Sequence, residues 1–284
     1  MSDTRRVCAV VDAHVHLHAC YEPDSFFDHA YFNLASAAGR AAPPNARACY
    51  LLMTECEGDN YFGELHATAQ AGPPGRGSWL RRWSLAPTGE AESFTAQEGN
   101  RRLYIVAGRQ VACREGLEVL IIGTTQRFRD GQPIRDVLAM AASLNVPHVI
   151  PWGLGKWFFQ RGRLLSELLR EFRKPTLFLG DEGGRPGFWP YPAHFREGAE
   201  LGVRDLPGTD PLPFPHDVVK VGRVGFRVLI DFDELRPAAS LLRTLCDGRT
   251  ELDRFASLEP PMKFVRNQFA MQLRKRRATS AAHP

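Results

Sequence analysis

The residues best suited to chemistry lie near the N-terminus, in the segment Asp12-Ala13-His14-Val15-His16-Leu17-His18. The segment directly follows an apolar run, residues 7–11, that predicts a short strand. Side chains at positions i and i+2 of a strand share a face, so Asp12 and the histidines should project the same way. Two neutral imidazoles at this spacing can bind one divalent ion, while a nearby carboxylate fixes a tautomer. The segment therefore predicts His14 and His16 as metal ligands with Asp12 behind them; hydrogen-bonded structural histidines are the alternative.

A second polar cluster, Gly208-Thr209-Asp210-Pro211, comes late in the chain. An aspartate just past a short strand is well placed to bind a metal or to act as a general base. Because Gly, Asp and Pro are common turn residues, a simple turn explains the cluster equally well. In combination with the histidine segment, it predicts Asp210 as a third metal ligand.

A third cluster, residues 180–186, follows the apolar run 176–179 and is rich in glycine. Its backbone could approach an anion closely, and Arg185 could clamp a phosphate or a carboxylate. Asp181 is the predicted catalytic proton acceptor, with Glu182 as an alternative. A charged, flexible surface loop is the simpler interpretation of the same residues.

A fourth cluster, Pro151-Trp152-Gly153-Leu154-Gly155-Lys156-Trp157, places two tryptophans beside a lysine. It predicts Trp152 as part of a substrate pocket and Lys156 as a catalytic charge partner. A lysine lying along core tryptophans is an equally good interpretation. The cluster is not a P-loop, because the spacing differs and no Ser or Thr follows the lysine.

The clusters follow runs in which strand and helix patterns alternate. Helical spacing over residues 137–144 precedes the strand pattern 148–150, and the amphipathic pattern 164–172 precedes the strand pattern 176–179. Repeated units of this kind imply a parallel sheet. Short strand patterns between residues 83 and 123 predict a β-hairpin insertion. We therefore predict an α/β fold, a distorted seven-stranded (β/α) barrel of the TIM type, with its site at the C-terminal ends of the strands.

The composition is that of a globular protein, with 44% hydrophobic and 24% charged residues. We expect one domain over residues 1–284, in which residues 249–284 form a C-terminal extension packed on the barrel. Much of the formal net charge of +4 comes from residues 274–277, which suit a solvated tail, so no nucleic-acid partner is predicted. No apolar run reaches the roughly 20 residues of a membrane span, and the N-terminus lacks the apolar region of a signal peptide. With six scattered cysteines and no C-x-x-C pair, a cytoplasmic location without membrane attachment is expected, and the oligomeric state stays open.

Together these motifs resemble the PHP (polymerase and histidinol phosphatase) domain, one of the metal-dependent hydrolase barrels. Residues 12–16 look like the D-x-H-x-H motif that opens that family. Residues 106–123 are similar to its segment in which a Gly-x-Glu turn precedes a Glu-x-His strand, and residues 208–210 look like its late Gly-Ser-Asp-x-His motif. The order along the chain agrees, and the resemblance spans residues 7–215.

The chain departs from the family pattern where further metal ligands belong. Gln110 stands in place of a ligand glutamate, and Leu120 in place of a strand histidine. Pro151-Trp152 replaces a histidine-proline pair, and Leu212 stands where a final histidine is expected. The family holds up to three metal ions, whereas this chain keeps ligands for one.

The resemblance implies a metal-dependent hydrolase that acts on a phosphoester or another small anionic substrate. One divalent ion, Zn, Mn or Fe, would be bound by His14, His16 and Asp210. The missing ligands leave two alternatives open. The chain is either a catalytically degenerate barrel, without metal, that serves in binding or assembly, or an amidohydrolase-like enzyme that cleaves C–N bonds.

Overall fold

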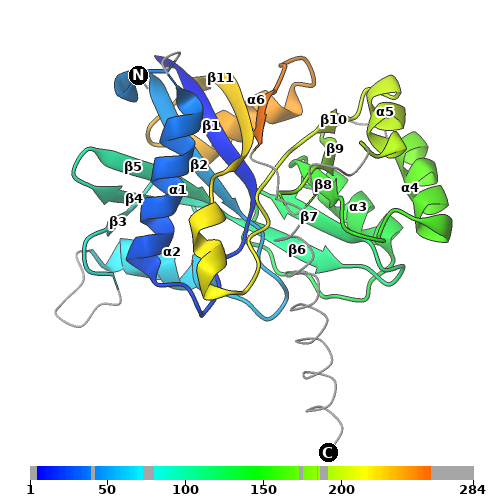
Figure 1. Cartoon of the computed structure of the whole chain (residues 1–284), viewed down its shortest axis with the longest axis horizontal. Coiled ribbons are helices and arrows are strands. Elements are labelled where there is room, and N and C mark those ends of the chain that lie inside the picture. The colour runs from blue at the N-terminus through cyan, green and yellow to red at the C-terminus, as the bar shows by residue number, and fades with distance from the viewer. Residues whose placement is uncertain are drawn as a thin grey trace, which may run out of the picture.

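The computed structural model describes residues 5–39, 42–72, 80–172, 175–183, 185 and 191–256. Its strands form two mixed sheets, which Figure 1 shows side by side. The strands of the larger sheet, in the order β12-β11-β1-β2-β5-β4-β3, are β12 (Asp253–Ala256), β11 (Val224–Phe232), β1 (Arg5–Val15), β2 (Arg47–Met53), β5 (Arg101–Val106), β4 (Ser93–Glu98) and β3 (Ser84–Pro87). Those of the smaller sheet, in the order β10-β9-β8-β7-β6, are β10 (Arg204–Asp205), β9 (Leu177–Gly180), β8 (His148–Pro151), β7 (Glu118–Ile122) and β6 (Gly108–Ala112).

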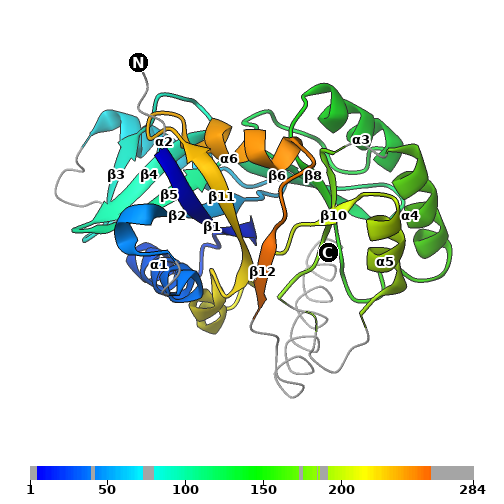
Figure 2. The same ribbon diagram turned by 90° about the horizontal axis from the view of Figure 1, so that it is seen from above.

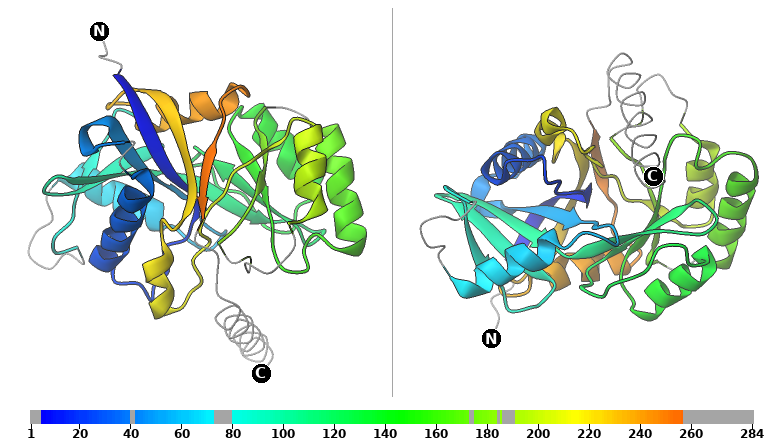
Figure 3. Two further views of the ribbon diagram at one scale, coloured as in Figure 1. Left: turned by 45° about the horizontal axis from the view of Figure 1, so that its top comes forward. Right: turned by 90° about the horizontal axis from the view of Figure 1, so that it is seen from below.

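Helices cover the outer faces of both sheets, as Figures 2 and 3 show. The α-helices are α1 (Pro23–Ala38), α2 (Tyr61–Ala71), α3 (Ile134–Ser143), α4 (Phe159–Glu171), α5 (Ala193–Glu200) and α6 (Pro237–Cys246), and short 3₁₀ helices span Pro44–Ala46 and Pro215–Lys220. Two of the helix starts have clear chemical causes. Glu22 caps α1 by accepting from the Ser25 N–H at 2.6 Å, with a proline in the first turn. Glu90, from the loop before β4, accepts from the first N–H groups of α6.

Three apolar clusters hold these layers together. The first joins α1 and α2 to one face of the larger sheet, and the third joins α3, α4 and α5 to the outer face of the smaller sheet. The second cluster contains residues of both sheets and of α6, including Tyr50 and Phe226 from the larger sheet and Phe178 from the smaller. The sheets therefore share a common core, which fixes the position of one against the other.

The predicted TIM-type barrel is wrong, although the α/β class is right. The two sheets do not close into one continuous ladder; an isolated bridge at Glu55–Arg109 and hydrogen bonds between β1 and the segment after β10 link them. The physical reason is the direction of the strands. β11 runs antiparallel to β1, and β6, β7 and β8 form an antiparallel meander, so the all-parallel pairing of a barrel cannot form.

The local sequence patterns predict the positions of the strands more accurately than they predict how the strands pair. Strands occur at every predicted run from 84 to 122, and β5–β4–β3 form an antiparallel edge on the parallel strands β1, β2 and β5. Of the predicted C-terminal extension, β12 pairs with β11, and residues 257–284, including the basic run 274–277, lie outside the described residues. None of the helices in the described part of the chain is long and apolar enough to cross a membrane.

Candidate metal centre

Strand β1 carries the histidine segment into the middle of the molecule. It is hydrogen-bonded on both sides, to β11 and to β2, and its last seven residues are buried. The β1–β2 register shifts between Asp12 and Val15, so the backbone is irregular where the histidines occur. Irregularities of this kind redirect side chains at the ends of strands. The side chains of His14 and His16 are both almost fully buried.

The segment 207–210 lies beside the last residues of β1, beyond the point where the pairing with β11 stops. The Ala13 N–H donates to the Pro207 carbonyl at 3.4 Å, and the Asp210 N–H donates to the His14 carbonyl at 2.8 Å. Gly208 is required for this approach, since a Cβ there would lie 2.2 Å from the His14 nitrogen. Asp210 has φ of +46°, a left-handed conformation that aspartate tolerates better than most residues and that often marks a functional position.

The Asp12 carboxylate holds β1 and the segment 207–210 together through hydrogen bonds. One oxygen accepts from the Thr209 N–H at 2.8 Å and from the His14 N–H at 3.3 Å, and the other accepts from the Gly222 N–H at 2.8 Å. Burial raises its pKa to about 6 against the opposing effect of these hydrogen bonds. The contacts show Asp12 tying β1 to two distant backbone segments, and its predicted catalytic role is untested.

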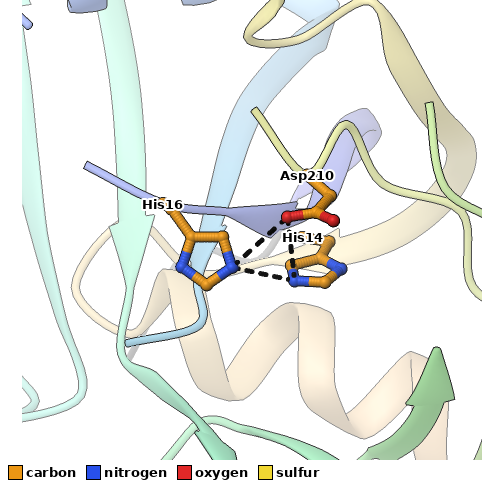
Figure 4. A group of neighbouring side chains, drawn as sticks. All are labelled: His14, His16 and Asp210. Atoms are coloured by element: carbon orange, nitrogen blue, oxygen red, sulfur yellow. Dashed lines mark hydrogen bonds and ion pairs between the residues drawn. The ribbon is translucent and has the colours of Figure 1, made fainter. Parts of the chain in front are cut away.

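Two imidazole nitrogens and one carboxylate oxygen converge at the end of β1 (Figure 4). The His14 and His16 Nε2 atoms are 3.0 Å apart. The Asp210 Oδ1 atom lies 3.7 Å from the first of these nitrogens and 3.5 Å from the second. The structure thus brings together the three residues that the sequence predicted as ligands.

These donor atoms fit a divalent metal ion. Zinc binds imidazole nitrogen at about 2.0–2.1 Å in tetrahedral geometry, which separates two ligand atoms by roughly 3.3 Å. The three separations of 3.0, 3.5 and 3.7 Å lie on either side of that value. A set of two imidazoles and one carboxylate also suits Mn and Fe, so the geometry does not select among these ions.

The charges around the donors are strongly coupled. Burial acts to lower the pKa of His14, but the Asp210 and Glu182 carboxylates outweigh it and raise that pKa to about 9. Burial and the neighbouring His14 charge lower the pKa of His16 to about 3. Burial acts to raise the pKa of Asp210, but the charges of the two histidines and of Lys156 outweigh it and hold that pKa below its usual value. Of the two histidines in the metal-free protein, His14 is therefore the one whose protonated form is favoured, and His16 is neutral.

Glu182, which the sequence offered only as the alternative to Asp181, is the carboxylate of this pair that lies beside the histidines. It lies just past β9, and its Oε1 atom is 3.0 Å from the His14 Nδ1 atom. Burial and the Asp210 charge raise its pKa to about 8. The available signal was alternation: adjacent residues Asp181 and Glu182 point to opposite sides of an extended chain, so only one of them can face β1.

Asp181, the predicted proton acceptor, is instead bound by two arginines. Arg185 contacts it in a bidentate manner at 2.8 and 3.0 Å, and Arg254 contacts it at 2.5 Å. Arg185 also lies over the Tyr191 ring, 5.5 Å from its centroid. Arg185, the predicted substrate clamp, is therefore part of an internal ion-pair network. Its sequence neighbours Gly184 and Pro186 lie outside the described residues.

Lys156 and Trp152 are placed differently from each other. Lys156 forms an ion pair with Glu118. Burial acts to lower the pKa of Lys156, but the charges of Glu118 and Glu182 outweigh it and raise that pKa. Its charge also acts on Asp210, which puts it at the rim of the metal centre. Trp152 is 3% exposed and belongs to the third apolar cluster, so its position is that of a core residue.

The positions that depart from the family pattern have distinct surroundings. Gln110, on β6, places its Oε1 atom 2.9 Å from the His14 Nε2 atom, which is where a ligand glutamate would act. Leu120 is buried in the second apolar cluster. Leu212 acts through its backbone, whose carbonyl accepts from the Tyr21 hydroxyl at 2.5 Å and whose N–H donates to Asp217 at 3.2 Å. Glu55, near Gln110, pairs with Arg109 at 2.7 Å and accepts from the Phe62 N–H in the first turn of α2.

Comparison of the chain with protein-family models and with curated proteins gives no match. Among solved structures, PsfC from Pseudomonas syringae PB-5123 is similar at 13% identity and a TM-score of 0.55, over 94% of this chain and 98% of that one. The lesion-specific endonuclease PfuEndoQ from Pyrococcus furiosus is similar at 11% identity and a TM-score of 0.50. That match covers 88% of this chain and 58% of the endonuclease, so this chain spans little more than half of its length.

A structure of endonuclease Q with a 27-mer duplex that carries an abasic lesion also matches, at 11% identity and a TM-score of 0.47. At these identities the likeness concerns the fold, and it agrees with the expected PHP-like fold. The likeness to the endonuclease PfuEndoQ contradicts our expectation that nucleic acid is excluded as a partner. The physical reason is that a small net charge says nothing about local surfaces, on which phosphate binding depends.

Proposed function

We propose that this protein is a metal-dependent hydrolase that cleaves a phosphoester, with one divalent ion bound by His14, His16 and Asp210. The observation that carries the proposal is the convergence of three ligand atoms, all within 4.8 Å of one another, from two segments almost 200 residues apart in the chain. When bound, such an ion would lower the pKa of a water molecule and polarise a phosphoryl oxygen.

The surrounding residues support this chemistry. The Glu182 carboxylate lies 3.0 Å from the His14 Nδ1 atom; it would favour a proton on Nδ1 and leave Nε2 free to bind the ion, in the manner of carboxylate–histidine–metal triads. Lys156 supplies a positive charge at the rim, where it would attract an anionic substrate. Because Asp181 is bound by two arginines, we assign the support of His14 to Glu182 and leave Asp181 with a structural role.

The substrate class follows from the charges and from the neighbours. A metal centre with a lysine at its rim suits a phosphate group, and a structural neighbour is an endonuclease, whose substrate is a phosphodiester. A phosphodiester of nucleic acid and a phosphomonoester of a small molecule are therefore the two substrates to compare. Assays with a dinucleotide, a single-stranded oligonucleotide and a phosphomonoester panel would distinguish them.

A second candidate function, binding without catalysis, is favoured by one observation. Gln110 occupies the place of a ligand carboxylate and contacts His14, and Leu120 is buried in the core. Within the described part of the chain, the side chains that could hold an ion form one group of three, which supplies ligands for a single ion. A protein that holds one ion but hydrolyses none of the substrates above would support the binding function.

Metal content tests the proposal most directly. Protein purified without a histidine tag should contain about one equivalent of Zn, Mn or Fe by elemental analysis, and the double variant His14→Ala/His16→Ala should contain almost none. His29→Ala, in α1 and away from the site, is the matched control and should keep its metal. A wild-type protein that stays metal-free after incubation with each ion would contradict the proposal.

A further inference from the structure

A cavity of about 260 Å³ lies at the end of the larger sheet opposite to the metal centre. Three arginines line it, and each comes from the start of a strand: Arg5 of β1, Arg47 of β2 and Arg102 of β5. These strands are parallel neighbours, so their N-terminal ends meet at one edge of the sheet, near the end marked N in Figure 1. The arginines are thus brought together by topology, although almost a hundred residues separate the first from the last.

The cavity wraps around this edge of the sheet. By alternation along the strands, Arg47 and Cys49 belong to the face that packs on α1, whereas Arg102 and Tyr104 belong to the opposite face. Cys49 and Tyr104 are indeed members of the first and second apolar clusters. Both are nearly fully buried, so the arginines extend from a rigid apolar base.

The lining carries positive charge without acidic residues. Arg47 donates to the Tyr31 hydroxyl at 3.1 Å, and Arg5 donates to the Asn45 carbonyl at 3.3 Å. Within the described part of the chain, neither of them pairs with a carboxylate. Arg102 alone has an acidic partner, the largely exposed Glu234. Like charges around one cavity repel each other, and a bound anion would remove that repulsion.

We propose that this arginine pocket binds the phosphate groups of a small phosphorylated molecule, independently of the metal centre. Guanidinium groups present planar pairs of N–H donors that match phosphate oxygens, and several of them can hold a diphosphate from different sides. The Asn100 amide and the tyrosine hydroxyls offer further donors at the same cavity, whereas the Gln97 oxygen accepts from Arg102 and its amide nitrogen donates to the Gly99 carbonyl. The volume is below the roughly 300–1,000 Å³ of pockets for drug-sized ligands, so it suits a compact anion or the phosphate end of a larger molecule.

Titration calorimetry with pyrophosphate tests the proposal, on the full chain and in the presence of EDTA so that no metal ion contributes. We expect saturable binding of one pyrophosphate, weakened about tenfold or more by Arg47→Gln and by Arg5→Gln, since each removes charge-assisted hydrogen bonds. Arg6→Gln is the matched control: Arg6 is exposed, adjacent to Arg5, and lines a different cavity, so binding should change by less than about twofold. His14→Ala/His16→Ala should bind pyrophosphate as the wild type does.

Four outcomes would overturn the proposal. The first is an absence of saturable binding by a wild-type protein that unfolds cooperatively. The second is an equal loss with Arg6→Gln, which would show a general charge effect. The third is a loss with the histidine variant, which would place the anion at the metal centre. The fourth is a single-stranded octathymidylate that binds through the same arginines and that pyrophosphate does not displace, which would make the pocket part of a nucleic-acid surface. Because Arg5 is exposed, Arg5→Gln should keep the wild-type unfolding temperature, so its result can be interpreted even if Arg47→Gln folds poorly.

Discussion

His14 is the residue on which the whole candidate site depends. Its Nδ1 atom contacts Glu182, while its Nε2 atom lies near His16, Gln110 and Asp210. A protonated imidazole has one N–H on each ring nitrogen, so the Nε2 atom can donate to only one of its three neighbours at a time. A divalent ion at Nε2 would replace the crowded contacts by coordination.

The stability of the metal-free protein should fall as the pH rises above about 6.5. The pKa of His14 is raised to about 9, so the stability that its charge provides is complete below 6.5 and is lost as the pH rises to 9. The pKa of Glu182 is raised to about 8, so its neutral form is favoured in the folded state and stability falls from about pH 4.5 to 8 for the same reason. Urea unfolding in EDTA at pH 6, 7, 8 and 9 measures the trend, and a stability that increases over this range would contradict it.

Replacement of Gln110 by glutamate should strengthen metal binding. The new carboxylate would lie where the amide oxygen now contacts His14, and it would add a negative charge beside the ion. We expect an affinity increase of about tenfold in competition with a chelator, comparable to the effect of groups that support metal ligands. Gln126→Glu, in the loop after β7, is the control and should leave the affinity unchanged.

The sequence predicted His14 and His16 because D-x-H-x-H after an apolar strand is a specific pattern, and Asp210 from the late Gly-Thr-Asp cluster in combination with it. It preferred Asp181 to Glu182 as the proton acceptor because residues 180–186 offer two adjacent carboxylates, and the choice between them depends on how the loop meets β1. The role of Trp152 was ambiguous for a similar reason, because a tryptophan beside a glycine-rich turn can line a pocket or pack in the core, and here it packs in the core. Long-range register, which a single sequence does not contain, decides both cases.

At the scale of elements, the contact between β1 and the segment 207–210 positions the ligands. Gly208→Ala should separate them, because the added Cβ would lie 2.2 Å from the His14 nitrogen. We expect a loss of about 1–3 kcal/mol in the free energy of unfolding and at least about tenfold weaker metal binding. Gly58→Ala, where no atom lies within 4 Å of the added Cβ, should change neither quantity. A Gly208 variant with normal metal affinity would show that this contact does not position Asp210.

Elements were predictable where periodicity was local. The helix patterns became α3 and α4, and the short strand patterns became β3, β4, β5 and β7, whereas β6 was not predicted. β11 was not predicted as a strand either. Its antiparallel pairing with β1 is a contact over more than two hundred residues, and it is this strand that turns the expected barrel into an open sheet.

At the scale of the whole molecule, the core between the sheets should make unfolding cooperative. Phe178, in β9, is fully buried in that core. Phe178→Ala should lower the free energy of unfolding by about 3–5 kcal/mol, because it leaves a cavity that contacts both sheets. Phe32→Ala, at a position 68% exposed on α1, should change it by less than about 0.5 kcal/mol. Separate transitions for the two sheets in wild-type urea unfolding would contradict the shared core.

The carboxylate of Asp12 has a consequence for how the protein is made. It bonds to the Gly222 N–H, 210 residues further along the chain, and to Thr209 just before that. At a synthesis rate of about 5–20 residues per second, roughly 10–40 seconds pass between the appearance of the histidines and that of their partners. During that interval the nascent chain presents two unpaired imidazoles without their carboxylate. The ability to bind an ion tightly would therefore appear abruptly, late in translation.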